Sequence, residues 1–434
     1  MTLHRALFSL DDTTDVEKIA RKMVDNDWEI IASKETVEVL KAHNIPVIPI
    51  EDFIEDYKDY GFPPTLHPKI EAALTKDVDY KIDLVYVIPY GPDKGDDVGG
   101  RTLLQLAQKG KRIFLSSVDA MKRFTYSRKL AWGENPYQQA ELSVLNMSDP
   151  LAIHSFEQIA GDVPEYTNMA DLDSILTTLC LLWEGLKHFG YGEIGVAAKH
   201  GNACGVAFED DEWCATGNAL IGNKRAIWGG EYITNGFVGK REAELLSSND
   251  VMLDVIAAPH FTDEAIEILS KRKQRKVFVN PALSTPTIDK SIHPRFVRGG
   301  LLSQSPADYV LESDNIDLLI AWAVAYSSFH GGNEIAIAKD GMLLGVGGGP
   351  STIDAANTAV QRAKEQGHDL QGASFCADAF FPFTDAPQVL IDAGCTHGAV
   401  PLGGKRENDI RNLFLNTGVQ MTWIPEQYRG FCRH

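Results

Sequence analysis

Short apolar runs alternate with helical patterns along the first 120 residues. Val16, Ile19, Ala20 and Met23 recur every three or four residues, which is the spacing of a helix with one apolar face. Apolar runs of four or five residues between such patterns are typical of buried strands. Repeated β-α-β units predict a doubly wound α/β fold, with a parallel sheet and helices on both faces. The predicted strands are 6–10, 28–32, 47–50, 84–88 and 112–115, and the predicted helices are 16–24 and 35–42.

A polar stretch at 118–128 separates this region from a longer, mixed remainder, in which two strand-rich halves meet near residue 330. No internal repeat is strong enough to prove a duplication. The pattern predicts helices at 171–186, 262–271, 317–328 and 353–365, and strands at 194–198, 251–257, 334–338 and 342–346. We therefore expect three domains, at 1–120, 121–330 and 331–434.

The formal net charge is −19, from 41 basic and 60 acidic residues. An acidic chain is a poor binder of nucleic acid or of an anionic membrane, although a local basic pocket could still hold a small anion. The six cysteines show no C-x-x-C spacing, so neither a zinc site nor a disulfide scaffold is expected. No apolar run reaches the roughly 18 residues of a membrane span. These features are compatible with almost any soluble cytoplasmic enzyme.

An apolar strand ends at two adjacent basic residues, Lys199 and His200, and a Gly-Asn turn and a Cys-Gly pair follow. A histidine beside a lysine is suited to general acid–base work, because the neighbouring ammonium favours the neutral, basic imidazole. The same ammonium can stabilise a developing oxyanion. The alternative is a surface pair at a strand end. Cys204 could act as a nucleophile with His200, but a small buried cysteine is the commoner role.

Three further stretches could carry chemistry. The segment 376–385 places three phenylalanines and a proline between Asp378 and Asp385, which would form an apolar wall for a flat ligand or, alternatively, a core strand and turn. The glycine-rich segment 345–349 precedes a predicted helix. Its backbone amides could hold an anion, but a tight turn that needs positive φ is the favoured interpretation. A polar–aromatic cluster at 132–138 lies near the predicted domain junction.

Taken together, these stretches resemble the bifunctional AICAR transformylase/IMP cyclohydrolase family of purine biosynthesis. The resemblance implies a methylglyoxal-synthase-like N-terminal domain and a transformylase region of two cytidine-deaminase-like α/β halves that lack the deaminase zinc. It also implies a homodimer with active sites at the subunit interface. Segments of this chain match the family's motifs in order. The segment 131–138 matches R-Y-G-E-N-P-H-Q, 199–205 matches K-H-x-N-P-C-G, 332–339 matches S-N-A to A-K, 377–385 matches S-D-A-F-F-P-F-R-D, and the C-terminus matches R-x-F-R-H.

By this resemblance, a formyl group passes from 10-formyltetrahydrofolate to the 5-amino group of aminoimidazole carboxamide ribonucleotide. His200 would accept the proton, Lys199 would be its electrostatic partner and Asn333 would hold the formyl group. The other implied substrate-binding residues are Trp132, Asn168, Asp171, Trp228, Gly229, Phe380, Pro382, Phe383, Asp385, Arg429 and His434. The residues that survive from the cyclohydrolase set are Tyr90, Asp97 and Lys109.

The chain departs from the family where phosphate would be held. Ala131, Ser305, Thr352 and Thr384 stand where the family has basic residues. A phosphate dianion prefers Arg or Lys, so these changes support formyl transfer better than they support a phosphorylated acceptor. The family's S-G-G-T phosphate turn reads Ser-Lys-Glu-Thr at 33–36, and the helical connector after the first domain is short. Cyclohydrolase activity is therefore expected to be weak or absent.

Three functions follow from these observations. The first is formyl transfer to the usual purine intermediate, and the second is the same chemistry on a different amine, for example a non-phosphorylated one. The third is an inactive paralogue that binds folate or nucleotide. Lys199, His200 and Asn333 argue against the third, since an inactive copy need not keep them. The lost basic residues favour the second over the first, but the match along the whole chain ranks the first ahead.

Overall fold

The computed structural model describes residues 4–55, 57–58, 61–126, 128–144, 149–190, 192–209 and 212–429. They form two compact units. The first runs to Lys129 and also contains Glu141–Asp149, and the second consists of Leu130–Ala140 and the chain from Pro150 onward. No helix within the described ranges is long and apolar enough to cross a membrane.

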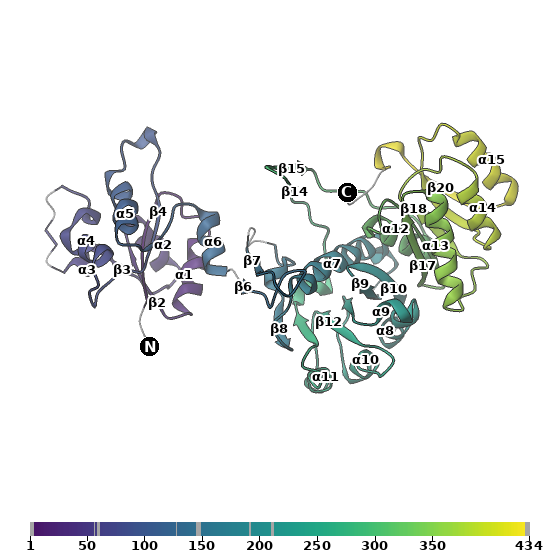
Figure 1. Cartoon of the computed structure of the whole chain (residues 1–434), viewed down its shortest axis with the longest axis horizontal. Coiled ribbons are helices and arrows are strands. Elements are labelled where there is room, and N and C mark those ends of the chain that lie inside the picture. Colours follow the sequence, from purple (N-terminus) through teal and green to yellow (C-terminus); the bar gives the residue numbers. More distant parts are fainter. Residues whose placement is uncertain are drawn as a thin grey trace. The chain divides into compact units, whose positions relative to one another are not determined.

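Five parallel strands form the sheet of the first unit, in the order β3-β2-β1-β4-β5. Neighbouring residues of a strand face opposite sides, so β1 sends Phe8 into one apolar layer and Leu7 into the other. Helices cover both faces (Figure 1), which confirms the predicted α/β class with a parallel sheet. The strands are β1 (His4–Leu10), β2 (Trp28–Ala32), β3 (Ile48–Pro49), β4 (Leu84–Ile88) and β5 (Ile113–Leu115). Helices α1 (Val16–Val24), α2 (Lys34–Ala42) and α6 (Val118–Tyr126) pack on the Phe8 side, and α3 (Ile50–Ile54), α4 (Pro68–Thr75) and α5 (Val98–Lys109) on the Leu7 side.

Helix α6 occupies most of the stretch that the sequence pattern indicated as a polar junction. Met121 of this helix is fully buried in the Phe8-side core. Lys122 is only 7% exposed, and its ammonium lies 2.7 Å from a carboxylate oxygen of Asp15. This contact lowers the pKa of Asp15, because the cation stabilises the carboxylate. The polar residues therefore belong to an amphipathic helix of the first unit and not to a linker.

An eleven-stranded sheet forms the second unit, in the order β20-β19-β18-β16-β17-β10-β9-β11-β12-β13-β8. Two short hairpins, β6–β7 and β14–β15, lie outside both large sheets. The strands of the large sheet are β8 (Glu157–Ala160), β9 (Glu193–Lys199), β10 (Asn202–Glu209), β11 (Gly230–Thr234), β12 (Leu253–Ala258), β13 (Lys276–Val279), β16 (Asn333–Lys339), β17 (Met342–Gly349), β18 (Ser374–Ala377), β19 (His397–Pro401) and β20 (Gln420–Ile424). The hairpin strands are β6 (Arg128–Lys129), β7 (Glu141–Leu142), β14 (His293–Val297) and β15 (Gly300–Gln304).

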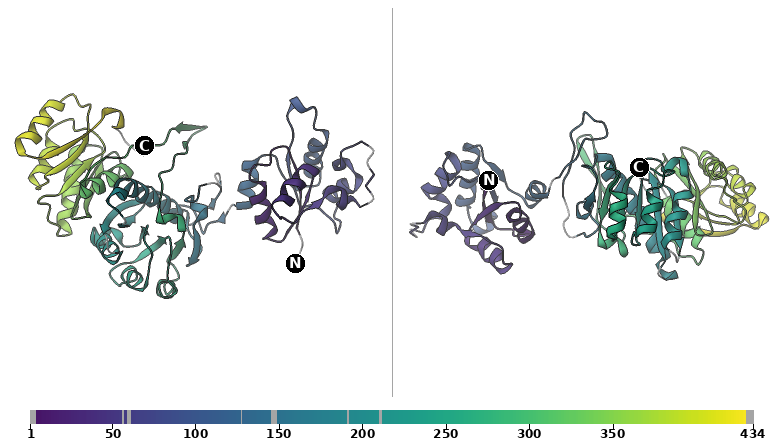
Figure 2. Two further views of the ribbon diagram at one scale, coloured as in Figure 1. Left: turned by 180° about the vertical axis from the view of Figure 1, so that it is seen from behind. Right: turned by 90° about the horizontal axis from the view of Figure 1, so that it is seen from below.

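The large sheet is built from two topological repeats. In each, a helix leads into an antiparallel hairpin, the next strand pairs antiparallel with the first hairpin strand, and two parallel strands follow. Figure 2 shows the first repeat in teal and the second in green to yellow. The helices of the first repeat are α7 (Tyr166–Leu186), α8 (Glu212–Ile221), α9 (Lys224–Ile227), α10 (Lys240–Leu246) and α11 (Asp263–Leu269). Those of the second are α12 (Ile316–Ser327), α13 (Thr352–Glu365), α14 (Asp385–Asp392) and α15 (Glu407–Thr417).

The leading helices of the two repeats, α7 and α12, pack against each other. The hydroxyl of Thr178 donates to Ser327 Oγ over 2.8 Å, and both side chains are buried. Every residue of α12 from Leu318 to Ser327 is buried, so this helix is apolar around most of its circumference. The contact ties the two repeats together.

The glycine-rich segment 345–349 is not the tight turn that the sequence suggested. Gly345 and Gly347 lie within β17, where helix α13 crosses the strand at close range. A Cβ atom on Gly345 would lie 2.4 Å from Ala359 O, and one on Gly347 would lie 2.4 Å from Ala355 O. The glycines are therefore needed for close helix–strand packing.

We expect Gly347→Ala to lower the free energy of unfolding by about 1–3 kcal/mol, because the added methyl group must push helix α13 away. Gly217→Ala is the matched control. Its new Cβ would lie 3.8 Å from Leu245 Cδ1, an ordinary contact, and alanine favours the helix by about 1 kcal/mol. Chemical denaturation of both variants measures the difference. Equal stability of the two would contradict the close-packing explanation.

Candidate active site

The predicted Lys199–His200 pair lies on the tight hairpin between β9 and β10. Lys199 pairs with Asn202 across the hairpin, which leaves His200 and Gly201 as a two-residue turn. Their φ angles are 53° and 67°, as a type I′ turn requires at both positions. A left-handed conformation is unusual for a residue with a side chain and is concentrated at functional sites. The turn holds His200 at the edge of the sheet.

This turn is wedged between helix α7 and the segment that precedes β16. A Cβ atom on Gly201 would lie 2.7 Å from Ser174 Cβ and 3.2 Å from Phe329 Cζ. Asn202 Oδ1 accepts a hydrogen bond from Phe329 N over 2.8 Å, and Asn202 Nδ2 donates to His200 O over 3.2 Å. One amide side chain therefore connects the His200 turn to the segment that leads to Asn333.

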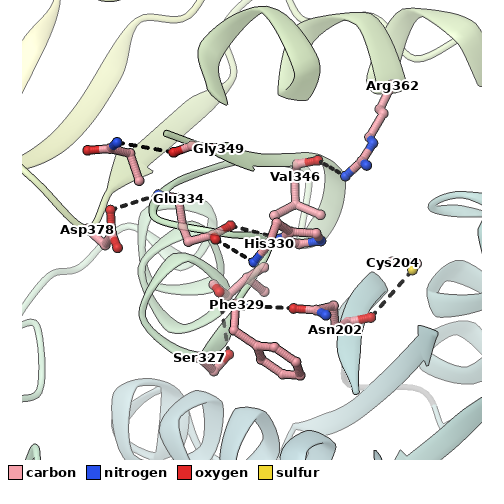
Figure 3. Close-up of polar contacts among 12 residues, drawn as sticks. Asn202, Cys204, Ser327, Phe329, His330, Glu334, Val346, Gly349, Arg362 and Asp378 are labelled. Atoms are coloured by element: carbon pink, nitrogen blue, oxygen red, sulfur yellow. Dashed lines mark hydrogen bonds and ion pairs between the residues drawn. The ribbon is translucent and has the colours of Figure 1, made fainter. Parts of the chain in front are cut away.

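Buried carboxyl groups fix the Asn333 segment (Figure 3). Glu334 is 1% exposed, accepts from His330 N over 2.5 Å and bonds His330 Nδ1 over 2.8 Å. Its own backbone N–H donates to Asp378 Oδ1 over 2.8 Å. Burial, together with the charge of Glu334, raises the pKa of Asp378 to about 8. Asn333 Nδ2 donates to Gly349 O over 3.1 Å, so its side chain lies along the end of β17.

The strand register brings His200 and Asn333 to the same edge of the sheet. Strands β10 and β17 run antiparallel, with Ala207 opposite Met342. Strand β17 ends at Gly349, which pairs with Asn333 at the start of β16, so the His200 turn and Asn333 lie at the same edge of the sheet.

Lys199 reaches a third predicted segment. Its ammonium donates to the carbonyl of Gly229, whose φ is 70°. A Cβ atom at this position would lie only 3.0 Å from Lys199 Nζ, so glycine leaves room for the ammonium. Trp228, the preceding residue, is 50% exposed at the same sheet edge. The structure therefore brings Lys199, Trp228 and Gly229 together.

A buried acid pair lies beside Lys199, and sequence reasoning found only one of its members. Glu231 is 2% exposed and stands opposite Ala198 in the sheet, next to Lys199. Burial raises its pKa to about 9, and the charge of Asp171 and a hydrogen bond with it add to the effect. Burial also raises the pKa of Asp171, against the opposing effects of that hydrogen bond and of the charges of His200 and Lys199. The pair keeps one proton at neutral pH, and Glu231 Oε2 has no hydrogen-bond partner among the described residues.

Two of the predicted substrate-binding residues lie at the start of α7. Trp132 O accepts from Tyr166 N over 3.0 Å, which places the 132–138 cluster beside this helix. Asn168 is 6% exposed, and its Oδ1 accepts from Glu165 N over 3.0 Å. Its side chain caps the N-terminus of α7, a structural role that the sequence did not suggest.

The predicted aromatic wall is partly open. Phe380 is half-buried, with the guanidinium of Arg429 lying 5.7 Å from its ring centre. Phe383 is 54% exposed, and Arg406 lies 5.9 Å from its ring centre. Pro382 is half-buried and Asp385 is exposed, where α14 begins. Two cation–aromatic pairs thus form a surface suited to a flat ligand. His434 lies outside the described residues.

Cys204 does not have the character of a nucleophile. Burial raises the pKa of its thiol to about 12, so the thiolate is scarce at neutral pH. Its sulfur donates to Asn202 O over 3.4 Å. Among the described residues, no group of three His, Cys, Asp or Glu side chains is placed to hold a metal ion.

Of the cyclohydrolase-set residues of the first unit, Tyr90 and Asp97 lie near each other, whereas Lys109 lies at the far end of helix α5. Asp97 caps the start of α5 by accepting from Gly100 N over 2.7 Å, whereas Lys109 is the last residue of that helix. Twelve residue steps at a rise of about 1.5 Å each separate their backbones by about 18 Å. Tyr90 Oη donates to Asp96 O over 3.5 Å, near Asp97, and Lys109 pairs with Glu71 at 3.4 Å.

Comparison with known proteins confirms the predicted family. Residues 104–362, more than half of the chain, match the model of the AICARFT/IMPCHase bienzyme family. The bifunctional purine biosynthesis protein PurH of Neisseria meningitidis is 26% identical over 97% of this chain and 98% of its own length. The PurH protein of Anoxybacillus flavithermus is 26% identical over 96% and 98%.

The Neisseria alignment spans 536 positions against 434 residues here, so at least 102 of its positions have no counterpart in this chain. A solved structure titled "Crystal structure of ForH" also matches, with 22% identity and a TM-score of 0.25. The match covers 27% of this chain and 75% of that one.

The acid pair predicts how stability depends on pH. The pKa of Glu231 rises from 4.5 to about 9 on folding, so the folded state keeps a proton that the unfolded state releases between these values. The free energy of unfolding should therefore fall as the pH rises from about 5 to about 9. Glu231→Gln cannot ionise and should exceed the native chain in stability at pH 8 by more than about 1.4 kcal/mol, the equivalent of one pKa unit. The difference should vanish near pH 4.

Denaturation curves at pH 4 and pH 8 measure this effect. Glu267→Gln, which removes an exposed carboxylate of α11, is the control and should change stability by less than about 0.5 kcal/mol at either pH. A Glu231→Gln variant that is no more stable at pH 8 would rule out the shared proton.

Proposed function

We propose, from the premise that the chain belongs to the AICARFT/IMPCHase bienzyme family, that it transfers a formyl group from 10-formyltetrahydrofolate to the 5-amino group of aminoimidazole carboxamide ribonucleotide. The observation that carries the proposal is the convergence of Lys199, His200 and Asn333 on one sheet edge. The base His200 and the cation Lys199 belong to the first repeat and the amide Asn333 to the second, and the Asn202–Phe329 hydrogen bond joins the two segments.

Formyl transfer needs a general base, a cation near the formyl oxygen and a group that orients the formyl carbon. The amine nitrogen attacks the formyl carbon, and His200 accepts the proton that the amine loses. The ammonium of Lys199 stabilises the negative charge that develops on the formyl oxygen. The amide of Asn333 orients the formyl group, and the intermediate collapses when its bond to N10 of the folate breaks and N10 takes up a proton. No metal is required, because the formyl amide is already the electrophile.

The surroundings of these residues suit the two substrates. The rings of Phe380 and Phe383, each with an arginine over it, offer flat surfaces for the heterocycles. The acid pair of Asp171 and Glu231 carries one negative charge beside Lys199. The 10-formyltetrahydrofolate is thus a co-substrate held at the edge of the large sheet.

A second acceptor is supported by a specific observation. Thr352 and Thr384 stand where family members have basic residues, and Glu231 places a carboxyl group inside the site. These features disfavour a phosphate at these positions and favour an amine without a phosphate. An inactive binding protein is the weaker alternative, since Lys199, His200 and Asn333 meet at one edge.

We expect cyclohydrolase activity of the first unit to be weak or absent. The family's S-G-G-T phosphate turn reads Ser-Lys-Glu-Thr at 33–36, and two cations of this unit are already paired with carboxylates, Lys94 with Asp11 and Lys122 with Asp15. A homodimer with interface active sites remains a prediction from the family resemblance, and the domain limits at 1–120, 121–330 and 331–434 remain predictions from the sequence pattern.

The decisive experiment is a formyl-transfer assay of the full chain with 10-formyltetrahydrofolate and a panel of aminoimidazoles with and without the 5′-phosphate. Release of tetrahydrofolate measures turnover. We expect transfer to the phosphorylated carboxamide acceptor. Turnover only with acceptors that lack the phosphate would identify the non-phosphorylated amine as the substrate. No turnover with any amine, together with tight folate binding, would favour the inactive binding protein.

His200→Ala should lower kcat by about 10²- to 10⁴-fold, because one positioned general base contributes that much. His397→Ala is the matched control on β19, and it should leave kcat within twofold. Full activity of the His200 variant would show that another group accepts the proton.

A further inference from the structure

We infer that the cavity beside Lys199 is an anion-binding subsite that holds the acidic end of a substrate. The cavity has a volume of about 590 Å³. Its walls include Trp228, Ser247, Asn249, Lys271, Arg272 and Arg275. The anion site stands on this geometry alone, whereas the identity of its ligand rests on the proposed function.

The cavity opens at the same sheet edge as the catalytic residues. Trp228 precedes β11, Met252 precedes β12 and Arg275 precedes β13, so the cavity lies where these parallel strands begin. Strand β9 runs antiparallel to β11, and its end at Lys199 therefore meets the same edge.

Gly229 links the cavity to Lys199. A Cβ atom on this glycine would lie 3.0 Å from Lys199 Nζ, 3.8 Å from Asp254 Oδ2 and 4.0 Å from Met252 Cε. Asp254 in turn accepts from Arg272 Nη2 over 2.7 Å. Gly229 therefore lies between Lys199 and two groups of the cavity region, the lining residue Met252 and the Asp254 carboxylate that pairs with Arg272.

The wall carries more positive than negative charge. Lys271, Arg272 and Arg275 face a single lining carboxylate, Glu244, in a chain whose net charge is −19. Arg272 is paired with Asp254. The local excess of cations therefore contrasts with the acidic chain as a whole and favours an anionic ligand.

Arg275 is the lining residue that most lacks a counter-charge. It is 4% exposed, and among the described residues its side chain donates only to neutral acceptors, Leu253 O at 3.4 Å and Ser247 Oγ at 3.0 Å. Burial and the neighbouring Arg272 lower its pKa, and Asp254 offsets only part of this effect. A buried guanidinium without a carboxylate partner is costly, and an anion in the cavity would supply the missing charge.

The chemistry of the wall selects carboxylate or phosphate oxygens. Arginine binds both through paired N–H groups, and lysine adds a point charge at the rim. The volume exceeds what one phosphate fills, and the half-exposed ring of Trp228 offers an apolar surface for a linking chain. Under the proposed function the candidates are the glutamate carboxylates of the folate and the 5′-phosphate of the acceptor.

The test is equilibrium binding to the full chain, without formyl transfer, of two probes: γ-linked triglutamate and ribose 5-phosphate. Arg272→Gln and Lys271→Gln should each weaken binding of the preferred probe at least fivefold. Lys273→Gln removes the same charge from an exposed residue two positions along, outside the cavity wall, and should change binding less than twofold. Thermal unfolding of each variant checks that the fold is kept. Because Lys271 is exposed, Lys271→Gln removes a lining charge without disturbing the core.

Tighter binding of triglutamate assigns the cavity to the folate, and tighter binding of ribose 5-phosphate assigns it to the acceptor; either supports the subsite. Binding of neither probe, or an equal loss in Lys273→Gln, overturns it. Anion binding without formyl transfer to any amine would refute the proposed function and leave the subsite standing.

Discussion

The pairing of β10 with β17 joins the two repeats into one sheet, and the candidate active site depends on it. Two hydrogen bonds hold this junction from its two ends: Phe208 N donates to Gly341 O over 2.9 Å, and Phe329 N donates to Asn202 Oδ1 over 2.8 Å. Both repeats carry the same left-handed turn, His200-Gly201 in one and Asp340-Gly341 in the other. Because the central strands are antiparallel, these turns lie at opposite ends of the sheet. Only the His200 turn therefore meets the start of β16, where Asn333 lies.

Burial changes the electrostatic meaning of the acidic composition. The pKa values of Glu231 and Asp378 rise to about 9 and about 8, so both groups keep protons at neutral pH and the formal charge of −19 overstates the real one. Glu231 pairs with Asp171 beside Lys199, and Asp378 contacts Glu334 beside Asn333. The carboxyl pairs hold the segments of the candidate site in place, whereas Arg272 and Arg275 make the adjoining cavity positively charged.

Local patterns predicted the fold well where one face of an element is apolar. The helix at 16–24 and the strands at 28–32 and 84–88 match the structure residue for residue. The helix at 118–126 was missed because its polar side chains find partners far away in sequence, such as Asp15 for Lys122. The same reason hid Glu231, whose partner Asp171 lies sixty residues earlier, although a charged residue in an apolar strand was a usable signal. Motif resemblance found Lys199, His200 and Asn333, but only strand register could show that they share one edge.

The central claim is that His200 and Asn333 act together although they belong to different repeats. A double-mutant cycle of His200→Ala and Asn333→Ala, measured as kcat for formyl transfer by the full chain, tests it most directly. Residues that act as a unit show strongly non-additive effects, so we predict a coupling of about 0.5–3 kcal/mol, with the double variant far less impaired than the product of the single effects. Additive effects of the two substitutions would contradict a shared site.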